Sequence, residues 1–481
     1  DLIGQCMDGV LVDVVYDGWS PARQYAVYHG GLRLLSESAS ARIASPVDIP
    51  FDRLGRGIGY DAKVSKWNFP NPWPGGHWTL GDIMHYQLAA FFSVAHNLAV
   101  NREEFLRNYY TVNQHAVERQ GTYIVPAAQS DPLATATLIN TLREGRVEIG
   151  RATAAFEAGG NAYPAGSYLI RLGQPNGAFA KTLLEDQHYP DLRQYPGGPP
   201  QRPYDVTAQT LPLLLGVKVT LVEGAVTATA SPVTSPVAAP AGQVGDAAAA
   251  AGYRLATQGQ DALLATYALL RQNAEVQRAG DGTLYVAAGA NAGAALAQTA
   301  RRFAVSATPV ATLPSGLRTL HLPRVGLYAS WVAQIDEGWT RFIFDQDGIP
   351  YTSIHDADLR VGDLRQRFDA ILIPDQNPRS LINGNPAGRV PPEYAGGPGT
   401  SGMDNLKTFV QQGGTLIALN QASLAFLDWT GGQVKDALAG DRAYYSPGSI
   451  LQVTSHPDVP AAWGAAPQVA IFSLQSPAFA L

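Results

Sequence analysis

PRVGLYAS, residues 323–330, opens the part of the chain in which strands and helices alternate most clearly. The run is short and apolar, with a proline before it and small residues at its end, which is typical of a buried strand. Two similar runs follow, FDAILIPDQ at 368–376 and GTLIALNQAS at 414–423, and helical segments at 331–346 and 403–413 separate them. This alternation predicts a parallel, doubly wound sheet. Its neighbouring strands are expected at 325–328, 370–374 and 415–419.

Two segments upstream share one pattern, near 121–185 and 252–303. Each has the pattern of a strand, a helix that ends in Leu-Arg, a second strand, and a third strand that leads through Gly and Asn into another helix. We interpret them as an internal duplication of one α/β unit; the alternative is convergence of a common α/β pattern. Residues 223–250 between them are rich in Ala, Val, Pro, Ser and Thr and nearly uncharged, which predicts a linker.

Length and composition limit the class of protein. The 481 residues exceed one ordinary core, so length alone suggests about three domains. Charged residues make up only 15%, and Gly and Pro number 49 and 34, as in a loop-rich globular protein. The net charge is −6 and there is no basic run, which argues against nucleic acid and anionic membranes as partners. A small molecule or a peptide is the expected partner.

The cysteine content and the apolar segments bear on disulfides, metal sites and membrane spans. Cys6 is the only cysteine, so we expect no internal disulfide and no thiolate metal site. The first residues lack a signal-peptide pattern, and the most apolar long stretch, 86–100, is too short to span a bilayer. From Thr79 to about Arg119 the apolar spacing predicts a helix, with Thr79 and Asp82 as a capping box.

A single carboxylate, Glu37, interrupts LRLLSESAS, residues 32–40, which otherwise has the pattern of a buried strand. A carboxylate removed from water costs several kcal/mol unless it is paired, hydrogen-bonded or bound. One interpretation is a glutamate at a strand end that reaches solvent or meets Arg33 or Arg42. The other is a carboxylate that a reaction requires.

The string VYDGWSPARQYAVYHGGLRLLSESAS, residues 15–40, resembles the end of the catalytic domain in a bacterial branch of the zinc carboxypeptidase family, that of carboxypeptidase A. Later phrases are similar to stretches that follow in the large proteins of that branch, among them KWNFPNPWPGGHWTLGDIMHYQLAAFFSVAH and RPYDVTAQTLPLLLGV. The last part of the chain resembles a class I glutamine amidotransferase. Together these resemblances cover nearly the whole chain.

Sequence pattern and resemblance together predict an α/β chain of five parts. They are the end of a carboxypeptidase-like catalytic domain at 1–120, the first α/β unit at 121–222, the linker at 223–250, the second α/β unit at 251–322, and an inactive amidotransferase-like domain with a doubly wound parallel sheet at 323–481.

The resemblance also implies roles for five residues. By position in the motif, Glu37 matches the family's catalytic glutamate, a general base that activates a zinc-bound water. Tyr16 best matches a tyrosine that closes over the substrate's terminal carboxylate, with Tyr25 and Tyr28 as rivals. Arg23, Tyr28 and His29 are the expected substrate-binding residues, although His29 is also compatible with a structural, hydrogen-bonded histidine.

Zinc is the cofactor that the resemblance implies for a longer parent protein. The family's His-x-x-Glu pair and second His precede the catalytic glutamate, and no His-x-x-Glu occurs before Glu37. We therefore expect the ligands upstream of Asp1, and neither zinc nor peptidase activity in this chain alone. His115 and Glu118 form a literal His-x-x-Glu, but in the wrong order for the family, and a solvated helix face explains them better.

The implied function is a metallocarboxypeptidase-like hydrolase that is exported to the periplasm or the cell exterior and cleaves peptide or amide bonds. The alternative is a non-catalytic binding or scaffold protein with a degenerate peptidase domain. Glutaminase activity is not expected, because Asn420, Gln421, Ala422 and Ser423 follow the strand where an amidotransferase needs a cysteine, and Ser423 lacks the glycines of a hydrolase elbow.

Overall fold

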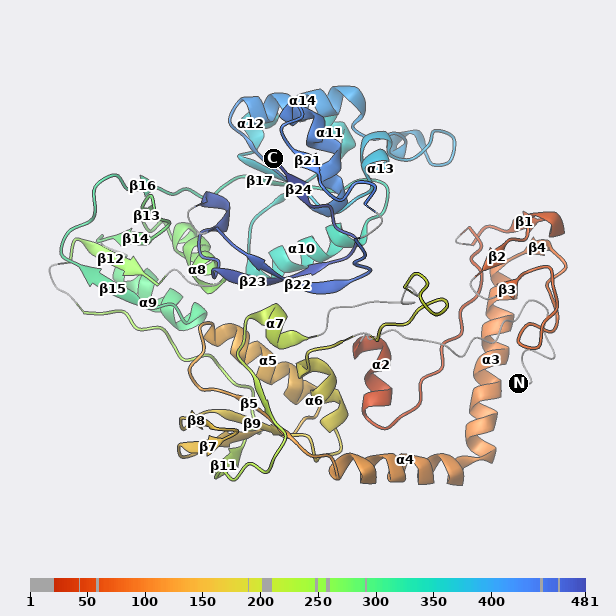
Figure 1. The fold of residues 1–481 in the computed structure, drawn as a ribbon. Coiled ribbons are helices and arrows are strands. Elements are labelled where there is room, and N and C mark those ends of the chain that lie inside the picture. The colour runs from red at the N-terminus through yellow and green to blue at the C-terminus, as the bar shows by residue number, and fades with distance from the viewer. Residues whose placement is uncertain are drawn as a thin grey trace. The chain divides into compact units, whose positions relative to one another are not determined.

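The computed structural model describes residues 21–481 except 43, 58–59, 189, 201–209, 247–249, 257–259, 290–291, 442–443 and 457–458. The chain is mixed α/β and divides into two compact units (Figure 1). The first comprises the described residues up to Ala128 with Ile139–Pro212 and Lys218–Pro236, and the second comprises Gln129–Leu138, Leu213–Val217 and Val237–Leu481.

The first unit begins with short elements. They are α2 (Pro21–Tyr28), β1 (Val47–Ile49), the 3-10 turn η1 (Phe51–Arg53), β2 (Arg56–Gly57), β3 (Tyr60–Asp61) and β4 (Gly76–Trp78). β1 pairs with β4 and β2 with β3, both antiparallel.

The strand predicted at 32–40 is absent. Residues 31–41 have no regular secondary structure, and Leu32 and Leu34 are 68% and 69% exposed. A strand is stable only where a neighbour completes its backbone hydrogen bonds. No strand in the described part of the chain pairs with this segment, so its apolar pattern alone did not suffice.

The helix predicted from Thr79 to Arg119 is two helices, α3 (Leu80–Val100) and α4 (Arg102–Val117). The predicted start is confirmed: the Thr79 side chain accepts from the Asp82 amide, and the Asp82 carboxylate accepts from the Thr79 amide in return. Asn101, with φ −108° and ψ 20°, interrupts the helical backbone between them.

Two five-stranded antiparallel sheets follow, one in each unit. The first has the order β10-β5-β9-β6-β11 and the second the order β15-β12-β14-β13-β16. The elements of the first are β5 (Thr122–Val125), α5 (Pro132–Glu144), β6 (Gly150–Ala152), β7 (Phe156–Ala158), β8 (Asn161–Tyr163), β9 (Tyr168–Arg171), α6 (Gly177–Leu184), α7 (Leu211–Leu215), β10 (Thr220–Val222) and β11 (Ala230–Pro232). Those of the second are β12 (Gly252–Leu255), α8 (Gln260–Arg271), β13 (Val276–Arg278), β14 (Leu284–Ala287), α9 (Ala292–Phe303), β15 (Ala307–Val310) and β16 (Arg318–Thr319).

The two sheets have one topology. In chain order each is built as β-α-β-β-α-β plus a fifth strand, and the first and third of these strands pair antiparallel at the centre. The fourth strand joins the first, and the fifth joins the second. The first copy differs by the inserted hairpin β7-β8 and by the additional short helix α7 before β10. Identical order and pairing support a duplication of one α/β unit.

The last part of the second unit contains a four-stranded parallel sheet of order β18-β17-β19-β20. The predicted neighbours at 325–328, 370–374 and 415–419 are confirmed as adjacent parallel strands. The elements are β17 (Val325–Tyr328), α10 (Ile335–Asp347), β18 (Thr352–Ile354), α11 (Asp356–Val361), α12 (Leu364–Arg367), β19 (Ala370–Ile373), α13 (Pro378–Asn383), η2 (Pro392–Tyr394), α14 (Gly399–Gln411), β20 (Thr415–Ala418), η3 (Asn420–Thr430), β21 (Lys435–Asp436), β22 (Ser449–Thr454), η4 (Pro460–Ala462), β23 (Gln468–Ser473) and β24 (Phe479–Ala480).

One face of this parallel sheet carries most of its core. Ile371 and Ile373 of β19 are fully buried and pack with Leu359, Leu406 and Phe409 of the surrounding helices. Parallel sheets are stable when both faces are covered. The second face is less covered at the edge strand β20, where Ile417 is 42% exposed.

The capping box predicts a local stability effect. Replacing Thr79 with Ala removes the acceptor for the Asp82 amide and should cost about 1 kcal/mol of helix stability. Hydrogen exchange at the Asp82 amide should therefore be faster in Thr79→Ala, whereas Thr79→Ser should exchange as the parent does. Unchanged protection in Thr79→Ala would show that the cap does not hold the first turn.

Candidate functional site

The segment around Glu37 is held on α3 by side-chain hydrogen bonds. Ser36 Oγ donates to Gln87 Oε1 at 2.7 Å, and Gln87 Nε2 donates to Ser38 Oγ at 2.7 Å. Trp78 Nε1 donates to the Ala39 carbonyl at 2.9 Å. Glu37 stands between the two anchored serines and is itself exposed. The backbone on both sides of this carboxylate is thus positioned, while its side chain remains open to solvent.

His29 lies on a packed surface. Its ring stacks on Tyr25 at 4.1 Å between centroids, and Phe179 lies 5.1 Å away. Nδ1 is 2.7 Å from the Tyr25 carbonyl oxygen, and Nε2 is 2.7 Å from that of Gly145. Both ring nitrogens therefore face backbone acceptors, which is the structural alternative that the sequence left open.

The structure describes only part of the other residues expected to contact substrate. Tyr28 ends α2 and is half-buried. Arg23 lies in α2, but its side chain is not described, and Tyr16 and Cys6 lie outside the described residues. Of the five residues expected to form the site, the structure thus describes the side chains of Glu37, Tyr28 and His29.

The alternative His-x-x-Glu is at the end of α4. His115 is in the last turn, Glu118 is the C-cap residue, and both are exposed. Among the described residues, no three His, Cys, Asp or Glu side chains gather closely enough to hold a metal ion.

A second cluster of polar residues lies at the carboxyl edge of the parallel sheet. Ligands of open α/β sheets bind beyond the carboxyl ends of the strands, where neighbouring connections leave in opposite directions. Here β17 is followed by β18 on one side and β19 on the other, so that point lies beyond Tyr328 and Ile373. Ser330 follows the first of these strands and Gln376 the second, and Gln376 Nε2 donates to Ser330 Oγ at 3.2 Å.

A buried network lies at the base of this edge. Tyr328 Oη donates to Asp356 Oδ1 at 2.6 Å, and both residues are 1% exposed. Burial first, and then the hydrogen bond to Asp356, raises the pKa of Tyr328 well above its usual range. Burial also raises the pKa of Asp356. This buried hydrogen bond between a phenol and a carboxyl group links the ends of β17 and β18. It therefore fixes the geometry of the two loops that begin there.

Aromatic rings lie beside this network. His355 Nδ1 is 2.6 Å from the Ala329 carbonyl oxygen, and its ring stacks on Trp331 at 4.2 Å and 9°. Tyr394 meets Trp331 edge-on at 4.7 Å. Trp331 and Tyr394 are each 39% exposed, so they form an accessible aromatic surface.

Asn420 occupies the sharp turn directly after β20. Its φ is +46°, in the left-handed region that few residues other than glycine adopt. Its Nδ2 donates to Asp375 Oδ2 at 2.8 Å, and the next amide, of Gln421, donates to Asp375 Oδ1 at 3.0 Å. Asn420 thus forms a strained elbow at a strand end, with an amide side chain at the turn.

The elbow carries no nucleophile that could form an acyl-enzyme. An amide side chain cannot attack a carbonyl, and Ser423 Oγ donates to the Asn420 carbonyl three residues earlier. The groups at this edge can form hydrogen bonds, stack and carry charge. Sequence reasoning missed Tyr328, Asp356, Asp375 and Gln376. A usable signal existed for three of them, since Tyr328 ends the strand predicted at 325–328, and Asp375 and Gln376 directly follow the strand predicted at 370–374.

Asp261 and Asp131 form a pair of carboxyl groups near the starts of α8 and α5. Asp261 is 7% exposed, and Asp131 Oδ1 accepts from the Ala134 amide at 2.8 Å. Burial and the neighbouring Asp131 raise the pKa of Asp261 to about 7. Two carboxyl groups in contact hold one proton between them more readily than two negative charges.

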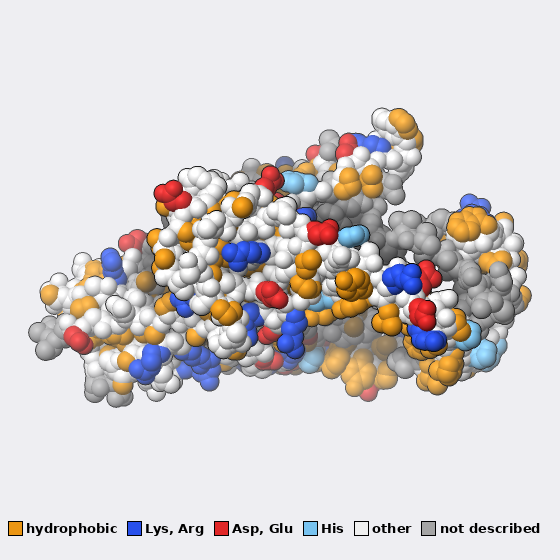
Figure 2. All heavy atoms as spheres, turned by 90° about the horizontal axis from the view of Figure 1, so that it is seen from below, with side chains coloured by type: hydrophobic (Ala, Val, Ile, Leu, Met, Phe, Trp, Pro, Cys, Tyr) orange, Lys and Arg blue, Asp and Glu red, His pale blue; other side chains and the backbone are white. Residues whose placement is uncertain are grey.

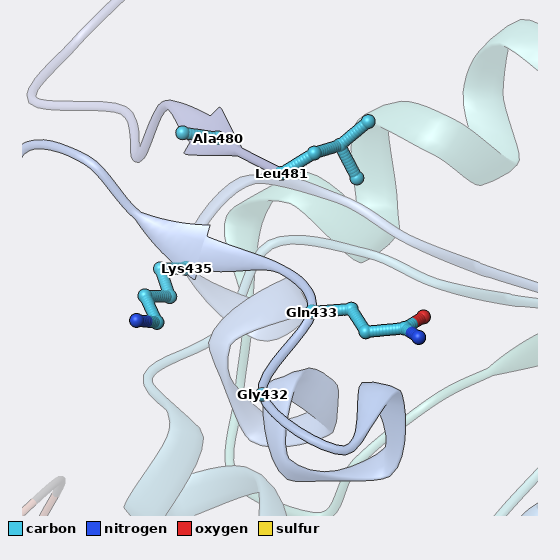
Figure 3. A pocket seen from close by; sticks show the side chains of 5 residues that line it. All are labelled: Gly432, Gln433, Lys435, Ala480 and Leu481. Atoms are coloured by element: carbon cyan, nitrogen blue, oxygen red, sulfur yellow. The ribbon is translucent and has the colours of Figure 1, made fainter.

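Two pockets in the described part of the chain do not coincide with these clusters. One of about 490 Å³ is lined by Gly432, Gln433, Lys435, Ala480 and Leu481. Figure 3 shows the Lys435 and Gln433 side chains pointing to opposite sides, so no polar groups converge there. Another pocket of about 320 Å³ lies beside α8 and α9.

Figure 2 shows basic and acidic side chains interspersed over one face of the molecule.

Comparison with protein-family models, with curated proteins and with solved structures found no match for this chain. In the part of the chain that the structure describes, no helix combines the length and the apolar character needed to cross a bilayer.

The elbow geometry predicts different costs for two substitutions. Asn420→Ala loses the hydrogen bond to Asp375 and places a Cβ-bearing residue without a compensating contact at positive φ, so it should destabilise the fold by about 2–3 kcal/mol. Asn420→Gly loses only the hydrogen bond and should cost about 1 kcal/mol. Urea unfolding followed by tryptophan fluorescence measures both. Equal losses for Ala and Gly would contradict the strain.

The Asp261 pair predicts a pH dependence of stability. The unfolded chain loses the Asp261 proton near its ordinary pKa of 3.8, whereas the folded chain keeps it to about pH 7. The unfolded state thus binds fewer protons in that window, and the free energy of unfolding should fall as pH rises from about 4 to about 7. Asp261→Asn should remove this fall and be more stable than the parent at pH 8 by roughly 2 kcal/mol.

Urea unfolding at pH 5 and pH 8 measures this difference, with Asp404→Asn as the control because Asp404 is exposed on α14. A parent protein whose stability does not change between the two pH values would refute the shared proton.

Proposed function

We propose that this chain is part of a zinc carboxypeptidase-like hydrolase in which Glu37 acts as the general base on a zinc-bound water. The resemblance of residues 15–40 to the end of such a catalytic domain is the starting point. The substrate class is a peptide or a peptide-like amide. The zinc ligands are expected upstream of Asp1.

The observation that carries the proposal is how Glu37 is presented. A general base must reach its proton within hydrogen-bonding distance, so it needs a fixed backbone and an open carboxylate. Gln87 holds both neighbouring serines, and Trp78 holds the next carbonyl. Glu37 itself remains exposed between them.

The surface of α3 provides further support. Asp82 is the only residue in α3 with a permanently charged side chain, and such a helix normally lies inside a core. Yet Met84, Phe91 and Phe92 are 56%, 61% and 71% exposed. Within the first unit, Figure 1 draws the half of α3 nearest α4 without a described strand or helix alongside it. We expect the zinc-bearing part of the catalytic domain to cover this apolar surface.

A non-catalytic binding role for residues 323–481 is the second candidate. It rests on the carboxyl edge, where polar and aromatic groups from four strands meet around an elbow that lacks a nucleophile. The two candidates are compatible, because they concern different units of the chain.

The test is made in a longer parent protein that contains the residues before Asp1. Glu37→Gln keeps the size of the side chain but removes the base, so peptide hydrolysis should fall by about two to four orders of magnitude. The zinc content should stay unchanged, because Glu37 is not a ligand in this proposal.

Glu104→Gln is the matched control, since Glu104 is an exposed glutamate in the first turn of α4. It should retain full activity. Near-normal turnover by Glu37→Gln would return Glu37 to a structural role and leave the binding alternative as the better explanation.

A further inference from the structure

We propose that the outer face of α10 is a docking surface for a basic amphipathic segment of a partner protein. This surface consists of Ile335, Trp339, Phe342 and Ile343. It belongs to the second unit, whereas Glu37 belongs to the first, so it is independent of the peptidase proposal.

The four side chains form one stripe along the helix. Their spacing of i, i+4, i+7 and i+8 places them on one face of α10. They are 77%, 61%, 51% and 51% exposed in chain order. The Trp339 and Phe342 rings meet edge to face at 5.7 Å, which makes the centre of the stripe a single aromatic surface.

The opposite face of α10 is attached to the sheet. Arg341 donates through Nη1 to Ser353 Oγ of β18 at 2.8 Å and also pairs with Glu337. Phe344 packs against Tyr351, just before β18, at 5.7 Å. These contacts fix the rotation of the helix, so the apolar stripe faces away from the sheet.

Carboxylates flank the stripe on both sides. By helical geometry, Asp336 and Asp347 lie along one border and Asp345 along the other. Asp345 accepts from the Tyr351 hydroxyl at 3.0 Å and Asp347 from the Gln260 amide at 3.0 Å, and both donors are neutral. Partial shielding from water and the nearby Asp375 carboxylate raise the pKa of Asp336. The only cation of α10, Arg341, is already paired with Glu337.

An apolar stripe with carboxylates on both borders specifies the chemistry of its partner. Apolar side chains of the partner would cover Trp339 and Phe342, and Lys or Arg side chains at its borders would meet the carboxylates. Lys and Arg also interact favourably with an exposed indole face. An amphipathic helix with basic flanks supplies both features at the spacing of α10.

The same charges disfavour two other occupants. A second copy of the chain would bring α10 against α10, and with acids at both ends of the helix, either orientation places carboxylates opposite carboxylates. An anionic lipid surface would face the same repulsion.

Gly338 leaves space beside the stripe. A Cβ there would meet no atom within 4 Å, so a partner side chain can approach the backbone.

The test uses two fluorescently labelled model helices of equal length and the full 481-residue chain. One carries Leu along one face and Lys elsewhere, and the other carries the same Leu face with Glu in place of Lys. In fluorescence anisotropy at low salt, the Lys peptide should bind at least tenfold more tightly than the Glu peptide. Its affinity should weaken as the salt concentration rises.

Two variants locate the binding. Trp339→Ala should weaken the Lys peptide at least tenfold, and the triple variant Asp336→Asn, Asp345→Asn, Asp347→Asn should weaken it similarly and flatten the salt dependence. Trp339 and Asp336 are exposed. Asp345 and Asp347 also accept hydrogen bonds within the protein, so circular dichroism verifies that the variants fold. The matched control is Tyr110→Ala with Glu103→Gln and Glu104→Gln, an exposed aromatic and two exposed acids on α4.

Three outcomes would overturn the proposal. Equal losses in the α4 control would mean unspecific attraction to an acidic protein. Sedimentation that shows a dimer lost in Trp339→Ala would make the occupant a second copy. Binding to vesicles of phosphatidylserine and phosphatidylcholine that Trp339→Ala abolishes would make it a lipid surface.

Discussion

Parallel pairing of β17, β18, β19 and β20 is the constraint on which the structure of residues 323–430 depends. Because the four strands run in one direction, their carboxyl ends meet at one edge. That edge therefore collects Tyr328, Asp356, Gln376 and Asn420, which are far apart in sequence. Their hydrogen bonds in turn fix the loops that carry Trp331 and the elbow. Antiparallel pairing would have distributed the same residues over both edges.

The sequence predicted the elements whose causes are local. Apolar runs of four or five residues identified β17, β19 and β20, and the Thr79 capping box identified the start of α3. It also indicated two similar α/β segments, which share one strand order. The strand expected at 32–40 was wrong because a strand depends on a partner, and pattern within one segment does not reveal whether a partner exists.

The candidate sites were also predictable only where their causes are local in the sequence. Asn420 was visible in the sequence as an amide where an elbow needs a nucleophile, and its positive φ agrees with such a turn. The Tyr328 and Asp356 pair was not visible, because it depends on β18 lying beside β17. The role of Glu37 rests on resemblance, whereas its fixing by Gln87 depends on contacts across about fifty residues that no local pattern encodes.

The helices α3 and α10 both expose apolar side chains, but the charges beside those side chains favour different kinds of contact. Both expose large apolar side chains, but α3 carries a single carboxylate and α10 carries acids on both borders of its stripe. Burial of α3 inside a domain costs almost no charge desolvation, so a domain core is its natural environment. Burial of α10 would leave its carboxylates without a compensating charge unless cations of the partner accompany the apolar contact. In the two proposals, the remainder of a folded domain therefore covers the first helix, and a partner that brings positive charge covers the second.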